Sequence, residues 1–149
     1  MNKFLLTIGI IAIGYIFCTA QEQKTEQEKI KFCVEQAINA LSNTGEIAIM
    51  KKYFHPGFEI MTLKEDNRLH KTPIYNWLEK TTIRKKQNKY PPEKKVTIEF
   101  ENIEITGNAA IVKFKYYKGE IHTCTDFMCL YKFNEGWRIV SAITYHHQD

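Results

Sequence analysis

The chain has 149 residues and a formal net charge of +4. This length suits one domain with a single hydrophobic core and excludes two domains of ordinary size. The charge is too small to indicate a nucleic-acid-binding protein, so composition does not dictate a partner.

Residues 1–20 have the anatomy of an export signal. Lys3 supplies a positive start, residues 4–17 form an uncharged apolar run, and small residues end at Ala20 before Gln21. The run is shorter than the ~20 residues of a membrane-spanning helix. We therefore expect cleavage after Ala20 and an exported protein, periplasmic or secreted.

Two alternatives to cleavage after Ala20 stay open, an uncleaved N-terminal anchor and lipidation at Cys18. Phe17 argues against lipidation because a lipoprotein signal has a small residue at that position. Cleavage removes one lysine and no acid, which lowers the net charge from +4 to +3. We assign residues 21–28 to a linker and residues 29–149 to the folded domain.

The cysteines beyond the signal are odd in number: Cys33, Cys124 and Cys129. In an oxidising compartment, at least one thiol must stay free or pair between chains. Cys124 and Cys129 would point to opposite faces of a regular strand and cannot easily bridge. We expect buried free cysteines that pack as small hydrophobic residues.

A helical period begins after the linker. Its apolar stripe consists of Ile30, Cys33, Val34, Ala37, Ile38 and Leu41. A second helix is predicted from Glu46 to Phe54, followed by a hairpin of Phe58 to Leu63 with Leu69 to Lys71. Thr72-Pro73 then begins a third helix, which we expect to be short.

The basic run from Arg84 to Lys95 is predicted to be a loop. It could hold an acidic partner, but a solvated surface is the simpler interpretation. After it, three turns separate four strand-like runs; they are Thr106-Gly107-Asn108, Lys118-Gly119-Glu120 and Asn134-Glu135-Gly136. The apolar parity flips at Asn102, which predicts a β-bulge and a strongly bent sheet.

The order of these elements resembles the NTF2-like superfamily. Four short motifs carry a closer resemblance to its SnoaL-like, lumazine-binding branch: Phe54-His55-Pro56, Ile105 to Ala110, Thr125 to Lys132, and Gly136-Trp137-Arg138-Ile139-Val140. The similarity spans Glu28 to His146. It implies an α+β cone in which a curved antiparallel sheet of four to six strands wraps around two or three N-terminal helices.

The resemblance also implies a pocket at the wide end of the cone, a bacterial source and a homodimer. Apolar residues on both faces of Ile121 to Phe133 support the dimer. The family includes isomerases, cyclases and dehydratases, and also binding domains without activity, so the fold does not fix a reaction.

Asp126 is the first candidate for chemistry. It shares a strand face with Cys124, Met128 and Leu130, where desolvation would raise its pKa and suit it to act as a general base or to bind a polar ligand. The alternative is an ion pair with a cation on a neighbouring strand, from Lys113, Lys115 or Arg138.

His55 is the second catalytic candidate, although a histidine before proline commonly fixes a turn. His122 is four residues, about 13 Å, from Asp126 along the strand, too far for a dyad. The candidate ligand-binding residues are Tyr53, Phe58, Trp77, Met128 and Tyr145; Tyr117 and Trp137 are further aromatic candidates, and most such rings belong to a core.

No nucleophile elbow, phosphate loop or metal motif is present in the sequence, so we predict no cofactor and no metal site. We expect a binding domain for a small apolar or planar molecule, leaning away from an enzyme. Two alternatives stay open: a small acid/base enzyme that uses Asp126, with His55 or a tyrosine as donor, and a protein-interaction module. We expect no nucleic-acid partner and no stable membrane span.

Overall fold

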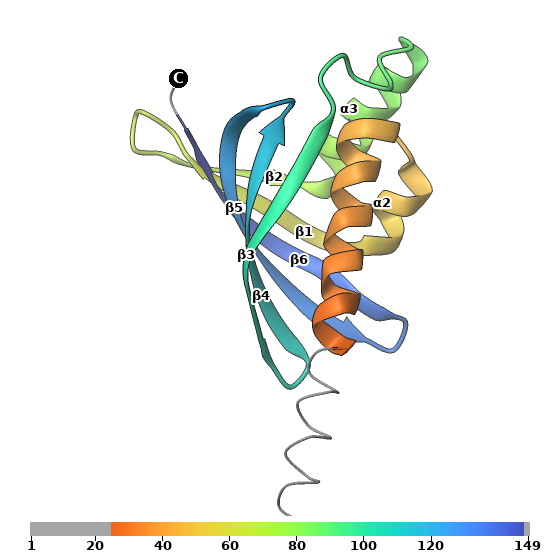
Figure 1. Cartoon of the computed structure of the whole chain (residues 1–149). Helices are drawn as coiled ribbons and strands as arrows, with labels where there is room; N and C mark the ends of the chain where they lie inside the picture. The colour runs from red at the N-terminus through yellow and green to blue at the C-terminus, as the bar shows by residue number, and fades with distance from the viewer. Residues whose placement is uncertain (1–24, 148–149) are drawn as a thin grey trace, which may run out of the picture.

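Helices cover one face of a curved sheet in the computed structural model, which describes residues 25–147 (Figure 1). A first helix occupies residues 25–39 and continues into the π-helical turn η1. The remaining elements are η1 (Ala40–Thr44), α2 (Ile47–Tyr53), β1 (Phe54–Leu63), β2 (Leu69–Pro73), α3 (Ile74–Lys86), β3 (Val96–Thr106), β4 (Ala109–Lys118), β5 (Ile121–Phe133) and β6 (Gly136–His146). This order confirms the α+β prediction.

The six strands form one sheet in the order β2-β1-β6-β5-β4-β3. The three predicted turns fall between β3 and β4, β4 and β5, and β5 and β6, so the meander is confirmed. The sheet is mixed rather than purely antiparallel, because β1 runs parallel to β6. The β1–β2 hairpin therefore joins the meander through β1, which pairs in parallel with the meander's edge strand β6.

The bulge predicted at the parity flip is present in β3. Phe100 pairs with Phe114 and Asn102 pairs with Lys113, which leaves Glu101 as the extra residue. Register shifts also interrupt the pairing of β4 with β5 and of β5 with β6. Such irregularities bend and twist strands, and they accompany the curvature that brings the sheet around the helices (Figure 1).

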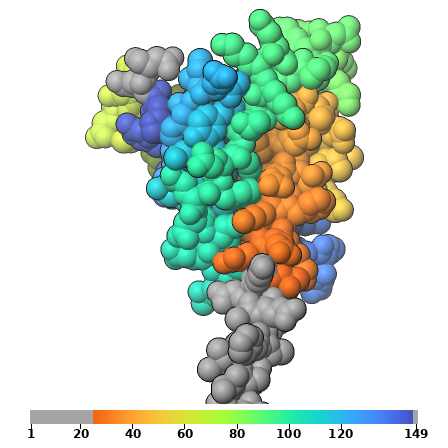
Figure 2. Space-filling view, viewed as in Figure 1, coloured from red at the N-terminus to blue at the C-terminus, as the bar shows by residue number. Residues whose placement is uncertain are grey.

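The first helix packs its predicted stripe into the core. Ile30, Val34 and Ala37 are each 0% exposed. Figure 2 shows this helix beside the edge strand β3 on one side of the molecule, and Lys31 Nζ lies 5.8 Å from the centre of the Phe100 ring on that strand. Phe114 and Ile139 lie in the same core from the sheet side.

Glu26 fixes the start of this helix to the β5–β6 hairpin. Its carboxylate accepts hydrogen bonds from Lys29 Nζ at 2.8 Å and from Trp137 Nε1 at 2.8 Å. Lys132 Nζ, on β5, lies 3.0 Å away. These partners lower the pKa of Glu26 from 4.5 to about 2, the Lys29 hydrogen bond most of all.

Gly45 ends η1 in the left-handed conformation, with φ at 67°. A Cβ atom there would lie 2.7 Å from Tyr90 Cδ2. The Tyr90 hydroxyl donates a hydrogen bond to the Leu41 carbonyl at 2.9 Å. Tyr90 thereby anchors the loop before β3 to the helical layer, and only glycine leaves room for its ring.

Helix α3 is longer than expected, and the prediction of a short helix was wrong. Thr82 lies within the helix and donates its hydroxyl back to the Leu78 carbonyl at 2.8 Å. The basic residues Arg84 to Lys86 occupy the last turn, where cations are favoured by the helix dipole.

Cys33, Cys124 and Cys129 are free thiols. Within residues 25–147, no helix has the length and apolar composition needed to cross a bilayer. The predicted export signal lies outside the described residues, and so does the linker up to residue 24; residues 25–28 already belong to the first helix.

Candidate functional site

The concave face of the sheet presents one inward-facing residue from each central strand at the same level. Asp126 on β5 pairs with Phe114 on β4 and with Thr144 on β6. Because side chains alternate along a strand, Met128 two residues further on β5 faces the same way, and it is also buried. Local alternation therefore directs Asp126 toward the helices.

Asp126 is 5% exposed. The Thr144 hydroxyl donates a hydrogen bond to Asp126 Oδ1 at 2.5 Å. The second carboxylate oxygen has no hydrogen-bond partner among residues 25–147. Burial raises the pKa of Asp126, while the Thr144 hydrogen bond and the His146 charge partly oppose that rise.

The proposed ion pair of Asp126 with a neighbouring cation does not form. Lys113 Nζ lies 2.9 Å from Glu101, and Lys115 Nζ lies 3.3 Å from the same carboxylate. On β4 both lysines are directly next to Phe114 in the sequence, so their side chains lie on the outer face of the sheet. Arg138 makes no ion pair with Asp126 among the described residues.

A cavity of about 770 Å³ lies between the concave face and the helices. Its apolar lining comes from both layers: Ile38, Leu41, Phe54, Phe58, Ile60, Ile74, Trp77, Val96 and Met128. Asp126, Thr144, Ser42 and Tyr116 contribute polar groups. Other polar side chains, several of them basic, complete the lining. A cavity that combines apolar walls with polar groups is typical of small-molecule sites.

Tyr116 and Ser42 form a second polar pair in this cavity, with their hydroxyl oxygens 3.0 Å apart. Burial raises the pKa of Tyr116. Sequence reasoning missed both residues. Alternation on β4 could have placed Tyr116 on the Phe114 face, but no local pattern indicates which helix residue it meets.

Three of the predicted ligand-binding residues, Phe58, Trp77 and Met128, line the cavity. The other two do not. Tyr53 contacts Phe32 edge-on, with ring centroids 6.3 Å apart, and Tyr145 is 61% exposed.

His55 does not line the cavity either. Its Nδ1 accepts a hydrogen bond from the Gly57 backbone N–H at 3.0 Å, and its ring stacks on Phe133 at 5.2 Å. His55 therefore makes a local backbone contact within the irregular first part of β1 and lies outside the cavity that Asp126 lines. His122 contacts Thr125 and the Cys124 carbonyl instead of Asp126.

Basic residues surround the cavity at one end. Arg84 and Lys94, from the run predicted to be a solvated loop, are among its lining residues. Their contribution was missed because it depends on how α3 and the loop before β3 fold over the sheet. Among residues 25–147, no group of three or more His, Cys, Asp or Glu side chains is arranged to hold a metal ion.

This geometry allows two kinds of chemistry. A desolvated carboxyl with one free oxygen can hold a proton and donate a hydrogen bond, or accept one when ionised. The apolar walls can bury a flat or aliphatic ligand.

Solved structures with the same fold are NTF2-like proteins. One from Shewanella baltica OS155, of unknown function, has a TM-score of 0.67 and 24% identity, covering 84% of this chain and 96% of that one. One from Silicibacter pomeroyi DSS-3, also of unknown function, has a TM-score of 0.68 and 13% identity, covering 84% and 98%. A third, from Methylobacillus flagellatus KT, has a TM-score of 0.63 and 21% identity, and the match covers 83% of this chain and 94% of that one. These identities establish the fold alone.

The chain thus has the fold of the NTF2-like proteins. The model of the family described as "Putative lumazine-binding" matches residues 25–146, and the chain belongs to that family. A comparison with curated proteins found no match.

Proposed function

We propose that this NTF2-like domain binds a small molecule with an apolar or planar body in the cavity and holds a polar group of that molecule at Asp126. The observation that carries the proposal is the buried carboxyl with a free oxygen facing a cavity of about 770 Å³. A closed core of this size would leave no such space, because protein interiors are close-packed.

Methionine methyl groups offer a direct test. Met128 lines the cavity, whereas Met50 and Met61 do not. We expect N-phenyl-1-naphthylamine, a neutral planar probe, to shift the [methyl-13C] NMR signal of Met128 and to leave those of Met50 and Met61 in place. An unchanged Met128 signal, or equal shifts of all three, would contradict the proposal.

A second proposal, general acid/base catalysis, is supported by the raised pKa of Asp126. In this version Asp126 takes a proton from the bound molecule, and Tyr116, which lines the same cavity, is the candidate donor. The test is hydrogen–deuterium exchange at carbon atoms next to the carbonyl in a panel of small ketones. Exchange that is equally fast with Asp126→Asn would exclude the carboxyl as the base.

We also propose a homodimer through the outer face of the sheet. Ile143 is 56% exposed and Phe127 is 40% exposed, and the two are cross-strand partners. Ile111, opposite Cys129, extends this apolar surface. Such a surface favours association with a second copy.

Light scattering at micromolar concentration tests the dimer. We expect twice the chain mass for the native protein and the monomer mass for Ile143→Lys. Leu63→Lys, at an exposed apolar position on the β1–β2 hairpin, is the control and should stay dimeric. A monomeric native protein would contradict this part.

Export remains a proposal that depends on the sequence of residues 1–20. The intact mass of the protein recovered from its native cells tests it. We expect a chain that begins at Gln21 and is found outside the cytoplasm. A full-length cytoplasmic chain would contradict the export signal.

A further inference from the structure

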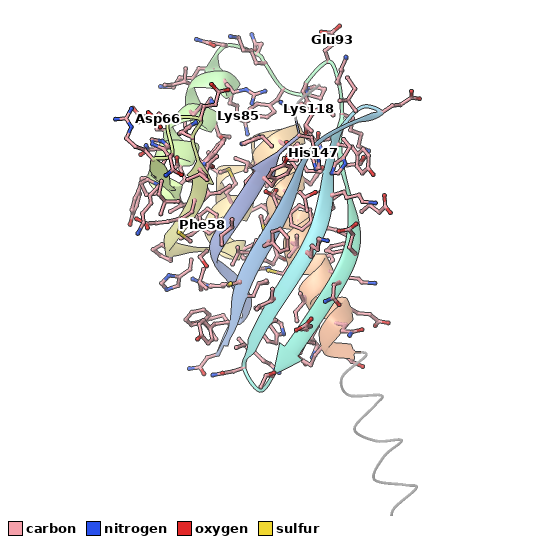
Figure 3. The ribbon with its side chains drawn as sticks, turned by 90° about the vertical axis from the view of Figure 1, so that its left-hand side faces the viewer. Phe58, Asp66, Lys85, Glu93, Lys118 and His147 are labelled. Atoms are coloured by element: carbon pink, nitrogen blue, oxygen red, sulfur yellow. The ribbon has the colours of Figure 1, made fainter. Side chains whose placement is uncertain are left out.

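The mouth of the cavity is cationic. Five basic side chains from four segments line it: Lys64 in the β1–β2 turn, Lys80 and Arg84 on α3, Lys94 before β3, and Lys118 at the end of β4. We call these five residues the basic rim. The rim side chains are exposed or half-buried, whereas Phe58 is 3% exposed, so the rim and the apolar walls occupy different depths. Figure 3 shows Lys118 toward one end of the sheet and Phe58 further down.

Acidic groups do not balance the basic rim. Glu93 is the one acidic residue at this mouth among the residues that line the cavity, since Asp126 lies buried at its floor. In the described part of the chain, no carboxylate lies within 4.0 Å of any rim nitrogen. By contrast, Lys113, Lys115 and Lys132 elsewhere on the sheet all have carboxylate partners.

Two of the rim cations are held in place by aromatic rings. The Arg84 guanidinium lies 4.9 Å from the centre of the Tyr90 ring, and Lys80 Nζ lies 5.4 Å from that of Trp77. Cation–π contacts of this kind orient a charge without neutralising it. The rim is therefore partly pre-organised and still positive.

The rim charges also act on groups inside the cavity. Burial raises the pKa of the Cys124 thiol to about 11, and the Lys118 charge offsets part of that rise. Arg84 has the same opposing effect on the pKa of Tyr116, which burial raises. A cleft lined by one sign of charge concentrates ligands of the opposite sign.

We propose that the ligand of this cavity is an amphipathic anion. Its apolar body occupies the inner walls, its neutral polar group reaches Asp126, and its carboxylate, sulfonate or phosphate lies among the basic rim. Lys118 is four strand residues from Phe114, the cross-strand neighbour of Asp126, which is about 13 Å along the strand. The spacing favours a molecule of two or three rings over a small inorganic anion. This inference rests on the proposed small-molecule site.

Two dyes with the same ring skeleton separate the two claims. N-phenyl-1-naphthylamine is neutral, and 1-anilinonaphthalene-8-sulfonate carries an added sulfonate. We expect the sulfonate dye to bind about tenfold more tightly, since several exposed ion contacts, each weak alone, act together on the sulfonate. Raising the salt from about 20 to about 500 mM should weaken only the sulfonate dye, because salt screens exposed charges.

The rim variant Arg84→Gln/Lys118→Gln should weaken the sulfonate dye about five- to tenfold and leave the neutral dye unchanged. The control Lys51→Gln/Lys86→Gln removes the same charge from exposed positions that do not line the cavity, and it should change neither dye. Arg84→Lys should retain most of the sulfonate affinity.

Equal affinities for the two dyes, or equal effects of the rim and control variants, would overturn the anion inference and leave the small-molecule site intact. A rim variant that weakens both dyes alike would also overturn it. Failure of both dyes to bind would overturn the proposed function, and the inference with it.

Discussion

Glu26 provides a quantitative test of how the first helix is held against the sheet. Its pKa falls from 4.5 to about 2, and at about 1.4 kcal/mol per pKa unit the shift corresponds to about 3 kcal/mol of unfolding free energy at neutral pH. Its partners Lys29 and Lys132 are 58% and 44% exposed. Solvent screening at such positions reduces the expected contribution to about 1–2 kcal/mol.

The substitution Glu26→Gln removes the charge but keeps an acceptor for Trp137 Nε1. We expect it to lower the unfolding free energy by about 1–2 kcal/mol at pH 7. Glu26→Ala should cost about 1–3 kcal/mol more, because the indole N–H loses its partner. Glu35→Gln, at an exposed position of the same helix, is the matched control and should change stability little.

The sign of the pH dependence follows from the lowered pKa. Stabilisation by Glu26 is fully present above the unfolded value of 4.5 and is lost as the pH falls toward about 2. Urea unfolding followed by circular dichroism at pH 7, 5 and 3 should therefore show the gap between native protein and Glu26→Gln closing in acid. No gap at pH 7, or a gap that widens in acid, would refute this account.

Three further predictions test the packing of the domain. Gly45→Ala should destabilise it by about 2–4 kcal/mol in urea unfolding, through the positive φ and the clash with Tyr90; an unchanged midpoint would contradict that packing. Asp126→Asn should raise the unfolding free energy at pH 7, because burial raises the pKa of the carboxyl and disfavours its charged form. The gain should vanish as the pH falls below about 3.9. A loss of stability at pH 7 would contradict this prediction. Iodoacetamide at pH 8, mapped by mass spectrometry, should label the half-buried Cys129 before Cys33, whose pKa burial raises to about 12; the reverse order would contradict it.

Local patterns in the sequence were sufficient for most of the fold. Three glycine-containing turns separated β3 to β6, and one parity change at Asn102 located the bulge at Glu101. The helical stripe that includes Ile30 and Val34 predicted the buried face of the first helix. Each of these features depends on residues that are close together in the chain.

Features that depend on distant residues were not predicted. The parallel pairing of β1 with β6 joins segments about 80 residues apart, such as Ile60 and Ala142, and neither strand contains a pattern that selects the other. The length of α3 was underestimated because composition alone does not show that Thr82 satisfies a backbone carbonyl.

The same limit applies to the site. Alternation along β5 was enough to place Asp126 and Met128 on one face. The basic rim was not predicted, because Arg84 and Lys118 come from separate elements and line the same cavity only in the folded chain. Tyr145 is exposed because it alternates with the buried Thr144 along β6 and therefore lies on the outer face of the sheet, away from the cavity.

The pKa of Asp126 is the most direct test of a buried carboxyl in a ligand cavity. It can be measured by 13C NMR titration of the carboxyl carbon, with Asp126→Asn to assign the signal. The structure predicts a value clearly above the ordinary ~3.9. A value at or below 3.9 would mean that the carboxyl is solvated or ion-paired, and it would contradict the proposed site.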